Sequence, residues 1–386
     1  MTMSAIPYAR QNISQKDIDA VVSVLKSDWI VQGKQVAAFE EALLSTCQSR
    51  FASATSNATT ALQLTYQALG LAPGDALWTT PITYLATSNA ALVCGASVDF
   101  VDINLATKNI CPQKLEDKLK NSKKRPKILT VVHMAGLPVD LKAIHTLAKK
   151  YEFAIVEDAS HALGATFQGD PIGDCKYSDA TVFSFHPVKI ITTGEGGAVL
   201  TNSGDLDKTI KLLRSHGVTR NPDLMPTPPL GDWYYAQIVL GNNYRMTDFQ
   251  AALGHSQLER LKIFIERRRT LARQYQEGLE GLPLHWQSEP NGAKSAYHLF
   301  LVNLDLDRIG KSHGEIYQEL HCRGILVNLH YYPVYLQPFY RNLGFKDGYC
   351  PNAETYYRTA LSLPMYYDLS DSEQNRVIQT LSKVLE

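Results

Sequence analysis

The sequence is poor in features that mark exported, membrane-spanning or metal-binding proteins. Its six cysteines are widely scattered and include no C-x-x-C pair, so we expect reduced, structural thiols and no metal site. No stretch approaches the roughly 20 consecutive apolar residues of a membrane-spanning helix. The first residues, MTMSAIPYARQNIS, lack the apolar run of a signal peptide. We therefore expect the protein in the cytoplasm.

An excess of charge of either sign is absent as well. The 38 lysines and arginines balance the 38 aspartates and glutamates, so the formal net charge is zero. This balance gives no electrostatic reason to expect nucleic acid or a membrane surface as a partner. Repeats and low-complexity tracts are also missing. A chain of 386 residues is too long for one simple core, so we expect two domains or a large domain with a smaller one appended.

What the sequence does contain is an alternation of short β-branched runs with helical patterns. Strands are expected where apolar residues run without a break, and helices where they recur at helical spacing. The expected strands are 51–55, 96–103, 127–134, 153–160, 179–185 and 197–202, and the expected helices are 14–27, 58–69, 111–121 and 140–151. This alternation predicts an α/β fold with a mainly parallel sheet covered by helices on both faces.

A long helical pattern over residues 247–279 carries the chain out of this layer. The elements expected beyond it are two strands, 296–304 and 324–332, and three helices, 313–323, 352–362 and 370–386. They predict a small α+β domain at the C-terminal end. We divide the chain into a large domain, residues 1–260, and a small domain, residues 261–386.

Two of the expected strands lead into charged residues. In parallel α/β sheets, ligands bind beyond the carboxyl ends of the strands. Asp158 closes the strand FAIVED, where it would either cap a helix or hold a proton on the ring nitrogen of a pyridoxal phosphate (PLP) cofactor. Lys189 follows the strand DATVFSF, where it is either a solvated surface group or, with a lowered pKa, an amine that can form a Schiff base.

Two further segments could be interpreted as sites that bind a nucleotide or a phosphate group. The Gly-rich turn TTGEGG, residues 192–197, matches neither G-x-G-x-x-G nor the P-loop pattern and leads to a strand, so it is not a nucleotide loop. Residues 56–60, SNATT, lie where a strand gives way to a helix. A helix N-terminus offers free N–H groups and a positive dipole end, which bind phosphate. Simple capping by Ser or Thr is the alternative interpretation of this segment.

The order of these segments resembles the DegT/DnrJ/EryC1/StrS family of nucleotide-sugar aminotransferases. The resemblance covers nearly the whole chain and is carried by IPYARQ, SNATTAL, TPITYLATSNA, VEDASHALGA, SFHPVKIITTGEGGAVLTN, GNNYRMTDFQAALG and HYYPVYLQPFY. It implies the PLP-dependent aminotransferase fold of type I, with a seven-stranded sheet between helices. It also implies a homodimer with active sites at the subunit interface.

The resemblance gives a role to each matching residue. Lys189 would form the Schiff base with PLP and move the proton during transamination, and Asp158 would keep the pyridine nitrogen protonated. Tyr84 would stack on the cofactor ring, and His161 would lie close to that ring, where many relatives have glutamine. The expected phosphate ligands are Ser184, the backbone amides of Ala58 and Thr59, and Asn243 of the neighbouring subunit. The expected substrate contacts are Tyr8, His330 and Tyr331.

The sequence departs from the common family pattern at two places. Ala58 replaces a glycine, which leaves the backbone N–H donor intact. The second departure is D-A-S-H in place of D-A-A-Q, and with SFHPVK and TTGEGG it is especially similar to the transaminases of pseudaminic acid synthesis. Those enzymes aminate C4 of a UDP-linked 4-keto-6-deoxy-N-acetyl-hexosamine. The resemblance therefore implies a nucleotide-linked keto sugar and L-glutamate as substrates.

Other functions stay open at this point. The chain could aminate another nucleotide sugar, such as a dTDP-linked 3-keto or 4-keto sugar, a GDP-perosamine precursor or a UDP-4-keto-pentose, because pocket shape decides that choice. A PLP-dependent sugar dehydratase would carry histidine in place of Lys189. A non-catalytic regulator would need an added domain, or the loss of Lys189 or Asp158, and the sequence shows neither.

Overall fold

A seven-stranded sheet forms the centre of the computed structural model, which describes residues 5–386. The strands, in spatial order, are β2 (Phe51–Thr55), β10 (Gly197–Thr201), β9 (Ala180–Ser184), β6 (Ala154–Asp158), β5 (Ile128–Val132), β3 (Ala76–Thr79) and β4 (Ser97–Phe100). All neighbours pair in parallel except β10, which runs antiparallel to both β9 and β2. The mainly parallel sheet expected from the sequence is confirmed.

Helices cover both faces of this sheet because its strands are apolar on both sides. In β5, Leu129 and Val131 point into one core cluster and Ile128 into the other. The helices on the first face are α2 (Gln35–Cys47), α5 (Pro112–Asn121), α6 (Leu141–Tyr151) and α8 (Asp248–Leu258). The helices on the second face are α3 (Ala58–Ala68), α4 (Ala86–Val93) and α7 (Gly204–Leu213).

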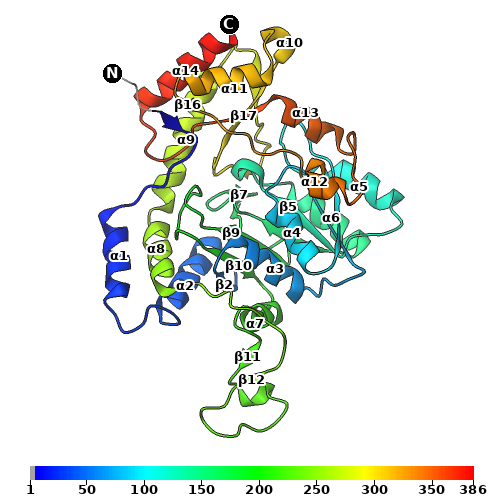
Figure 1. The fold of residues 1–386 in the computed structure, drawn as a ribbon, viewed down its shortest axis with the longest axis vertical. Helices are drawn as coiled ribbons and strands as arrows, with labels where there is room; N and C mark the ends of the chain where they lie inside the picture. The colour runs from blue at the N-terminus through cyan, green and yellow to red at the C-terminus, as the bar shows by residue number, and fades with distance from the viewer. Residues whose placement is uncertain (1–4) are drawn as a thin grey trace.

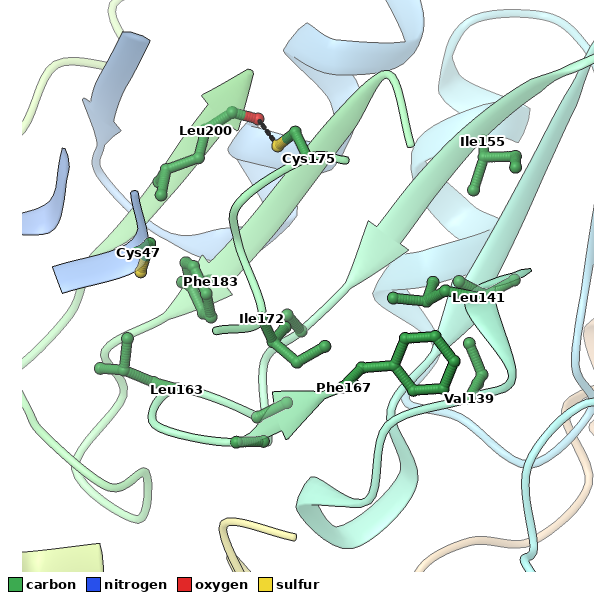
Figure 2. Close-up of a cluster of buried hydrophobic side chains, with 14 of the residues drawn as sticks. Cys47, Val139, Leu141, Ile155, Leu163, Phe167, Ile172, Cys175, Phe183 and Leu200 are labelled. Carbon is green, nitrogen blue, oxygen red and sulfur yellow. Dashed lines mark hydrogen bonds between the residues drawn. The ribbon is translucent and has the colours of Figure 1, made fainter. Parts of the chain in front are cut away.

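Figure 2 shows part of the first core, where side chains from different segments meet on β9 and β10. Phe183 of β9 lies there with Cys47 of α2, and both are fully buried. The thiol of Cys175 lies 3.2 Å from the carbonyl oxygen of Leu200 and donates to it. Burial raises the pKa of the Cys47 thiol to about 12. These cysteines are free and act as small core residues, as expected.

The C-terminal part has a core and a sheet of its own. Its antiparallel sheet has the order β13 (Leu284–Trp286), β15 (Phe300–Leu304) and β17 (Ala360–Leu363). The helices beside it are α9 (Leu261–Gly278), α10 (Leu306–Ile309), α11 (His313–Cys322), α13 (Pro351–Thr359) and α14 (Asp371–Leu385). Helix α12 (Pro338–Arg341) lies instead against α4, where the Tyr340 hydroxyl donates to the Asn89 side chain at 2.6 Å. Figure 1 shows α9, α10, α11 and α14 together at one end of the molecule. The small α+β unit expected from the sequence is present.

Apart from short 3-10 helices, the remaining elements of residues 5–386 are one helix and seven two-residue strands. The helix is α1 (Gln15–Leu25), which packs against α8. Two strand pairs are β1 (Ile6–Pro7) with β16 (Ile325–Leu326) and β11 (Val218–Thr219) with β12 (Ala236–Gln237). A three-stranded sheet has the order β14 (Ala293–Lys294), β7 (Thr166–Phe167) and β8 (Asp170–Pro171). Because β1 pairs with β16, the N-terminal segment joins the C-terminal part. The domain boundary at residue 260 stays a prediction.

Three expected elements differ from those observed. The strand expected over 324–332 is only the two-residue strand β16, which ends at Leu326. The pattern over 247–279 is two helices, α8 and α9, with a break at Glu259 and Arg260. There the Arg260 guanidinium donates to the side chains of Asn12, at 2.6 Å, and Asp17, at 2.8 Å. The helix expected over 352–362 ends at Thr359, because the next residues pair with β15 as strand β17. Long-range contacts of this kind override local periodicity.

One segment leaves the body of the protein, and we call residues 215–243 the arm. Figure 1 shows β11 and β12 extending from the sheet beyond α7. Large apolar side chains on the arm are exposed, with Leu240 at 85%, Leu230 at 75% and Trp233 at 69%. No helix among residues 5–386 is both long and apolar enough to cross a membrane.

Candidate active site

A cavity of about 620 Å³ lies where β6 and β9 end. It is lined by ten of the eleven residues that the sequence and its resemblance single out: Tyr8, Ala58, Thr59, Tyr84, Asp158, His161, Ser184, Lys189, His330 and Tyr331. They come from the N-terminal segment, the start of α3, the loop before α4, the ends of β6 and β9 with the loops that follow them, and the loop after β16. The volume is typical of a small-molecule site.

Asp158 ends β6 and is nearly buried, with 5% of its surface exposed. Its Oδ2 accepts a hydrogen bond of 2.7 Å from the hydroxyl of Thr87, and its Oδ1 accepts one of 3.2 Å from the backbone N–H of Ser160. Thr87 is bonded in turn to the hydroxyl of Thr83, at 2.8 Å. The residues directly after Asp158, 159–165, form turns and no helix, so the helix-cap interpretation is wrong. The carboxylate is oriented toward the cavity instead.

Lys189 lies in a loop between β9 and β10 that backbone hydrogen bonds hold in shape. Phe185 accepts from the N–H of Thr193 and donates its own N–H to Gly196, both at 2.9 Å. Lys189 itself donates its N–H to the carbonyl of His186. Burial lowers the pKa of its amine to about 8, although the negative charge of Asp158 acts in the opposite direction. A neutral amine is therefore accessible near neutral pH, as a nucleophilic lysine requires.

The N-terminus of α3 forms another wall of the cavity. Asn57 caps the helix by accepting a hydrogen bond of 2.9 Å from the N–H of Thr60. The N–H groups of Ala58 and Thr59 belong to the first turn, which has no partners within the helix. A Cβ at Gly197 of β10 would lie 2.7 Å from the nitrogen of Ala58, so glycine lets the strand approach this turn. The hydroxyl of Ser184 lines the same cavity.

Aromatic side chains and buried histidines form the rest of the wall. The ring of His161 lies nearly parallel to that of Tyr331, with centroids 6.3 Å apart, and 4.4 Å from the ring of His298. The Nδ1 atoms of His161 and His298 are buried without a hydrogen-bond partner in the described chain. Burial, with the positive charge of Lys189, lowers the pKa of both histidines well below the usual value and that of His330 to about 3. All three are neutral at pH 7.

Asn243 is the one expected residue that does not line this cavity. It lies on the arm, where it pairs with Ser215 in a single β-bridge and is exposed to solvent. Its expected role concerns a neighbouring subunit, so its position in one chain does not test that role.

Sequence reasoning missed several lining residues, chiefly His298, Asn328 and Glu195, and it also missed Thr87, which bonds to the lining residue Asp158. Thr87 and His298 come from segments far from Asp158 in the sequence, and no motif points from one to the other. A signal exists only for Thr87, which follows Tyr84 by three residues at the start of α4, and its N–H donates to the Tyr84 carbonyl at 3.3 Å.

Comparison with known proteins defines the class to which this site belongs. The chain is 37% identical over 382 residues, 99% of its length and 98% of the relative's, to the UDP-4-amino-4,6-dideoxy-N-acetyl-beta-L-altrosamine transaminase of Campylobacter jejuni. Among solved structures, Helicobacter pylori PseC, an aminotransferase involved in the biosynthesis of pseudoaminic acid, aligns with a TM-score of 0.91 at 30% identity over 99% of both chains. The PLP form of Spr1654 from Streptococcus pneumoniae aligns with a TM-score of 0.89 at 30% identity, over 99% of this chain and 98% of the other.

The fold and the site therefore define a PLP-dependent aminotransferase. The match to the family covers residues 11–382, and the chain belongs to the DegT/DnrJ/EryC1/StrS aminotransferase family.

The cavity fits PLP in the chemistry of its donor set. It combines an amine of lowered pKa for the aldehyde, a buried carboxylate for the pyridine nitrogen, and a helix N-terminus with a serine hydroxyl for the phosphate. The buried nitrogen of His161 that has no partner is a further polar atom open to a bound group. When bound, PLP supplies the electron sink that lets an amino group move between carbon atoms.

Proposed function

We propose that the protein aminates C4 of a UDP-linked 4-keto-6-deoxy-N-acetyl-hexosamine, with L-glutamate as amino donor. The observation that carries this proposal is the full-length similarity to the C. jejuni transaminase and to PseC, together with the D-A-S-H sequence at residues 158–161. In the balanced reaction glutamate leaves as 2-oxoglutarate, and the ketone carbon of the sugar gains the amino group.

The chain's own residues supply the steps that hold the reactants and move protons. We assign Lys189 as the residue that binds the cofactor covalently and then, as a neutral amine, moves a proton between the two reacting carbons. Asp158 holds a proton on the ring nitrogen by its charge, and Thr87 fixes the orientation of that carboxylate at 2.7 Å. Tyr84, which lines the cavity and is 63% exposed, would stack on the ring of bound PLP and exclude water from that face.

The phosphate and substrate contacts follow from the same geometry. The free N–H groups of Ala58 and Thr59 and the hydroxyl of Ser184 hold the phosphate. The substrate contacts that we assign are Tyr8, His330 and Tyr331. Because His330 is neutral and buried, it binds the sugar by hydrogen bonding rather than by charge.

We further propose that the working form is a homodimer whose partner's arm completes each site. The exposed apolar residues of the arm support this, since large apolar patches mark protein–protein contacts. The exposed position of Asn243, outside the cavity of its own chain, agrees with a contact to another subunit.

The substrate is tested by incubating the PLP-loaded protein with L-glutamate and a panel of UDP-, dTDP- and GDP-linked keto sugars. Mass spectrometry and NMR should identify a C4 amine on the UDP-linked 4-keto-6-deoxy-N-acetyl-hexosamine, formed together with an equal amount of 2-oxoglutarate. Faster amination of a dTDP sugar, a GDP sugar or a UDP-4-keto-pentose would replace this substrate by the one preferred.

A further inference from the structure

A second cavity, of about 610 Å³, lies next to the active site but outside it. Its walls are the loop over residues 104–109, strand β13 with the residues after it, and helix α13. Tyr356 of α13 lines this cavity, and its hydroxyl donates to the carbonyl oxygen of His330, which lines the active site. The two cavities therefore share a wall, and the proposed transamination uses only one of them.

The second cavity contains a buried lysine without an acidic neighbour. Lys108 is 5% exposed, and no aspartate or glutamate lines the cavity among the residues that the structure describes. Its ammonium donates to the carbonyl oxygen of Leu105 and lies 5.6 Å from the centroid of the Tyr356 ring. Burial alone lowers the pKa of this amine to about 8. A buried cation without a counter-ion is costly, and a bound anion removes that cost.

The loop that carries Lys108 is fixed in shape. The side-chain oxygen of Asn104 accepts from the N–H groups of Ala106 and Thr107, at 2.9 and 3.1 Å. The backbone carbonyl of Asn104 accepts from the N–H of Lys108 at 2.8 Å. This turn holds Lys108 in the left-handed region, with φ at 60°, which is unfavourable for a residue with a side chain. The position of Lys108 at the cavity therefore combines a strained backbone angle with the loss of hydration of its ammonium group.

The other residues that line the second cavity indicate which groups the ligand carries besides the anion. Trp286, half-buried, offers a flat apolar surface beside Leu284 and Leu304. Asn303 donates its Nδ2 to Tyr356 and Thr359, but its buried Oδ1 accepts from no residue in 5–386. A ligand with a hydrogen-bond donor would satisfy this oxygen.

We propose that this cavity binds a small organic anion, a carboxylate or a phosphate ester on a flat apolar body. Lys108 binds the anionic group, Trp286 packs against the flat body, and Asn303 accepts a hydrogen bond from it. The site is separate from the one that performs the transamination.

Titration calorimetry of the PLP-loaded protein tests this site with three probes. Salicylate and phenyl phosphate carry the anion as carboxylate or phosphate, and salicylamide is a neutral counterpart. We expect one anion to bind once per chain, at least tenfold more tightly than salicylamide. The anion that binds more tightly identifies the natural anionic group.

Two variants and a control separate this site from general anion binding. Lys108→Met should weaken the anion at least tenfold, whereas Lys262→Met, at an exposed lysine of α9, should leave it unchanged. Ser288→Trp fills the cavity from its exposed edge, and it keeps the backbone N–H of residue 288 that donates to Ala106 in the Lys108 loop. This variant should also abolish binding, which tests the site if Lys108→Met does not fold. Equal affinity in wild type and Ser288→Trp, no binding of either anion, or displacement by a saturating keto-sugar nucleotide would overturn the proposal.

Discussion

Among single residues, the buried carboxylate of Asp158 distinguishes this cavity from an ordinary cleft. A carboxylate at 5% exposure loses most of its hydration, so its hydrogen bonds and any nearby positive charge decide its state. Thr87 supplies the shorter of the two bonds it accepts. The hydroxyl of Thr83 bonds to Thr87, one step further from the carboxylate.

The hydrogen bonds from Thr83 to Thr87 and from Thr87 to Asp158 predict losses of activity that become smaller with distance from the carboxylate. Asp158→Asn should retain PLP but lower kcat by on the order of 10²–10³-fold, the size of loss seen when one charge-stabilising group is removed. Thr87→Val should cost about tenfold, since one hydrogen bond to a charged group is lost, and Thr83→Val should cost less. Steady-state kinetics with cofactor content measured by absorbance gives the order. An Asp158→Asn enzyme within a few-fold of wild type would show that the carboxylate is only structural.

Lys189 makes the stability of the cofactor-free protein depend on pH. Its pKa falls from 10.5 to about 8 on folding, so between these values the unfolded chain binds more protons than the folded one. The free energy of unfolding therefore rises with pH across this window, and the penalty is complete below about pH 8. Urea unfolding at pH 7.5 and 9.5 should show the wild type gaining roughly 2 kcal/mol relative to Lys189→Met. A difference that does not change with pH would mean that the amine is solvated.

Among the elements, the contact of β10 with the start of α3 shapes the cavity wall to which we assign phosphate binding. A Cβ on Gly197 would lie 2.6 Å from the carbonyl carbon of Asn57 and 2.7 Å from the nitrogen of Ala58. Both neighbours are backbone atoms of the cap and first turn, so neither can move without shifting the helix.

Gly197→Ala should therefore weaken PLP binding at least tenfold and destabilise the fold by about 1–3 kcal/mol, as overpacking does. A matched control is Gly314→Ala in α11, where an added Cβ has no neighbour within 4 Å. Fluorescence titration with PLP and urea unfolding measure the two effects. If both variants bind PLP as the wild type does, the close approach does not position the helix N-terminus.

The same elements show what local patterns in the sequence can predict. Asp158 and Lys189 were found because each follows an apolar strand, and the N-terminus of α3 because small polar residues separate a strand from a helix. Strand β3 was missed, since its four residues, ALWT, give too short a pattern. Thr87 and His298 were missed because their approach to the site depends on which strands pair, and neighbouring residues do not encode that.

For the whole molecule, the decisive question is whether the site is shared between two chains. If Asn243 acts in the partner's site, mixing a Lys189→Ala chain with an Asn243→Ala chain should restore activity, because each mixed dimer has one site without either lesion. Activity is measured after conditions that allow subunit exchange, with each variant alone as control. Absence of recovery despite demonstrated exchange, with Asn243→Ala itself inactive, would mean that each chain builds its own site.

The position of β10 in the sheet also has a consequence for biosynthesis. β2 is at the edge of the sheet, and among residues 5–386 its only strand neighbour is β10. Phe51–Thr55 can therefore complete its pairing only after Thr201 has left the ribosome. The β2 strand therefore waits, with an open edge, while β3, β4, β5, β6 and β9 are translated. The turn at Asn57 lies directly after β2 and is closed by Gly197 of β10. The contact between β10 and the start of α3 is thus among the last parts of the large sheet to form on a nascent chain.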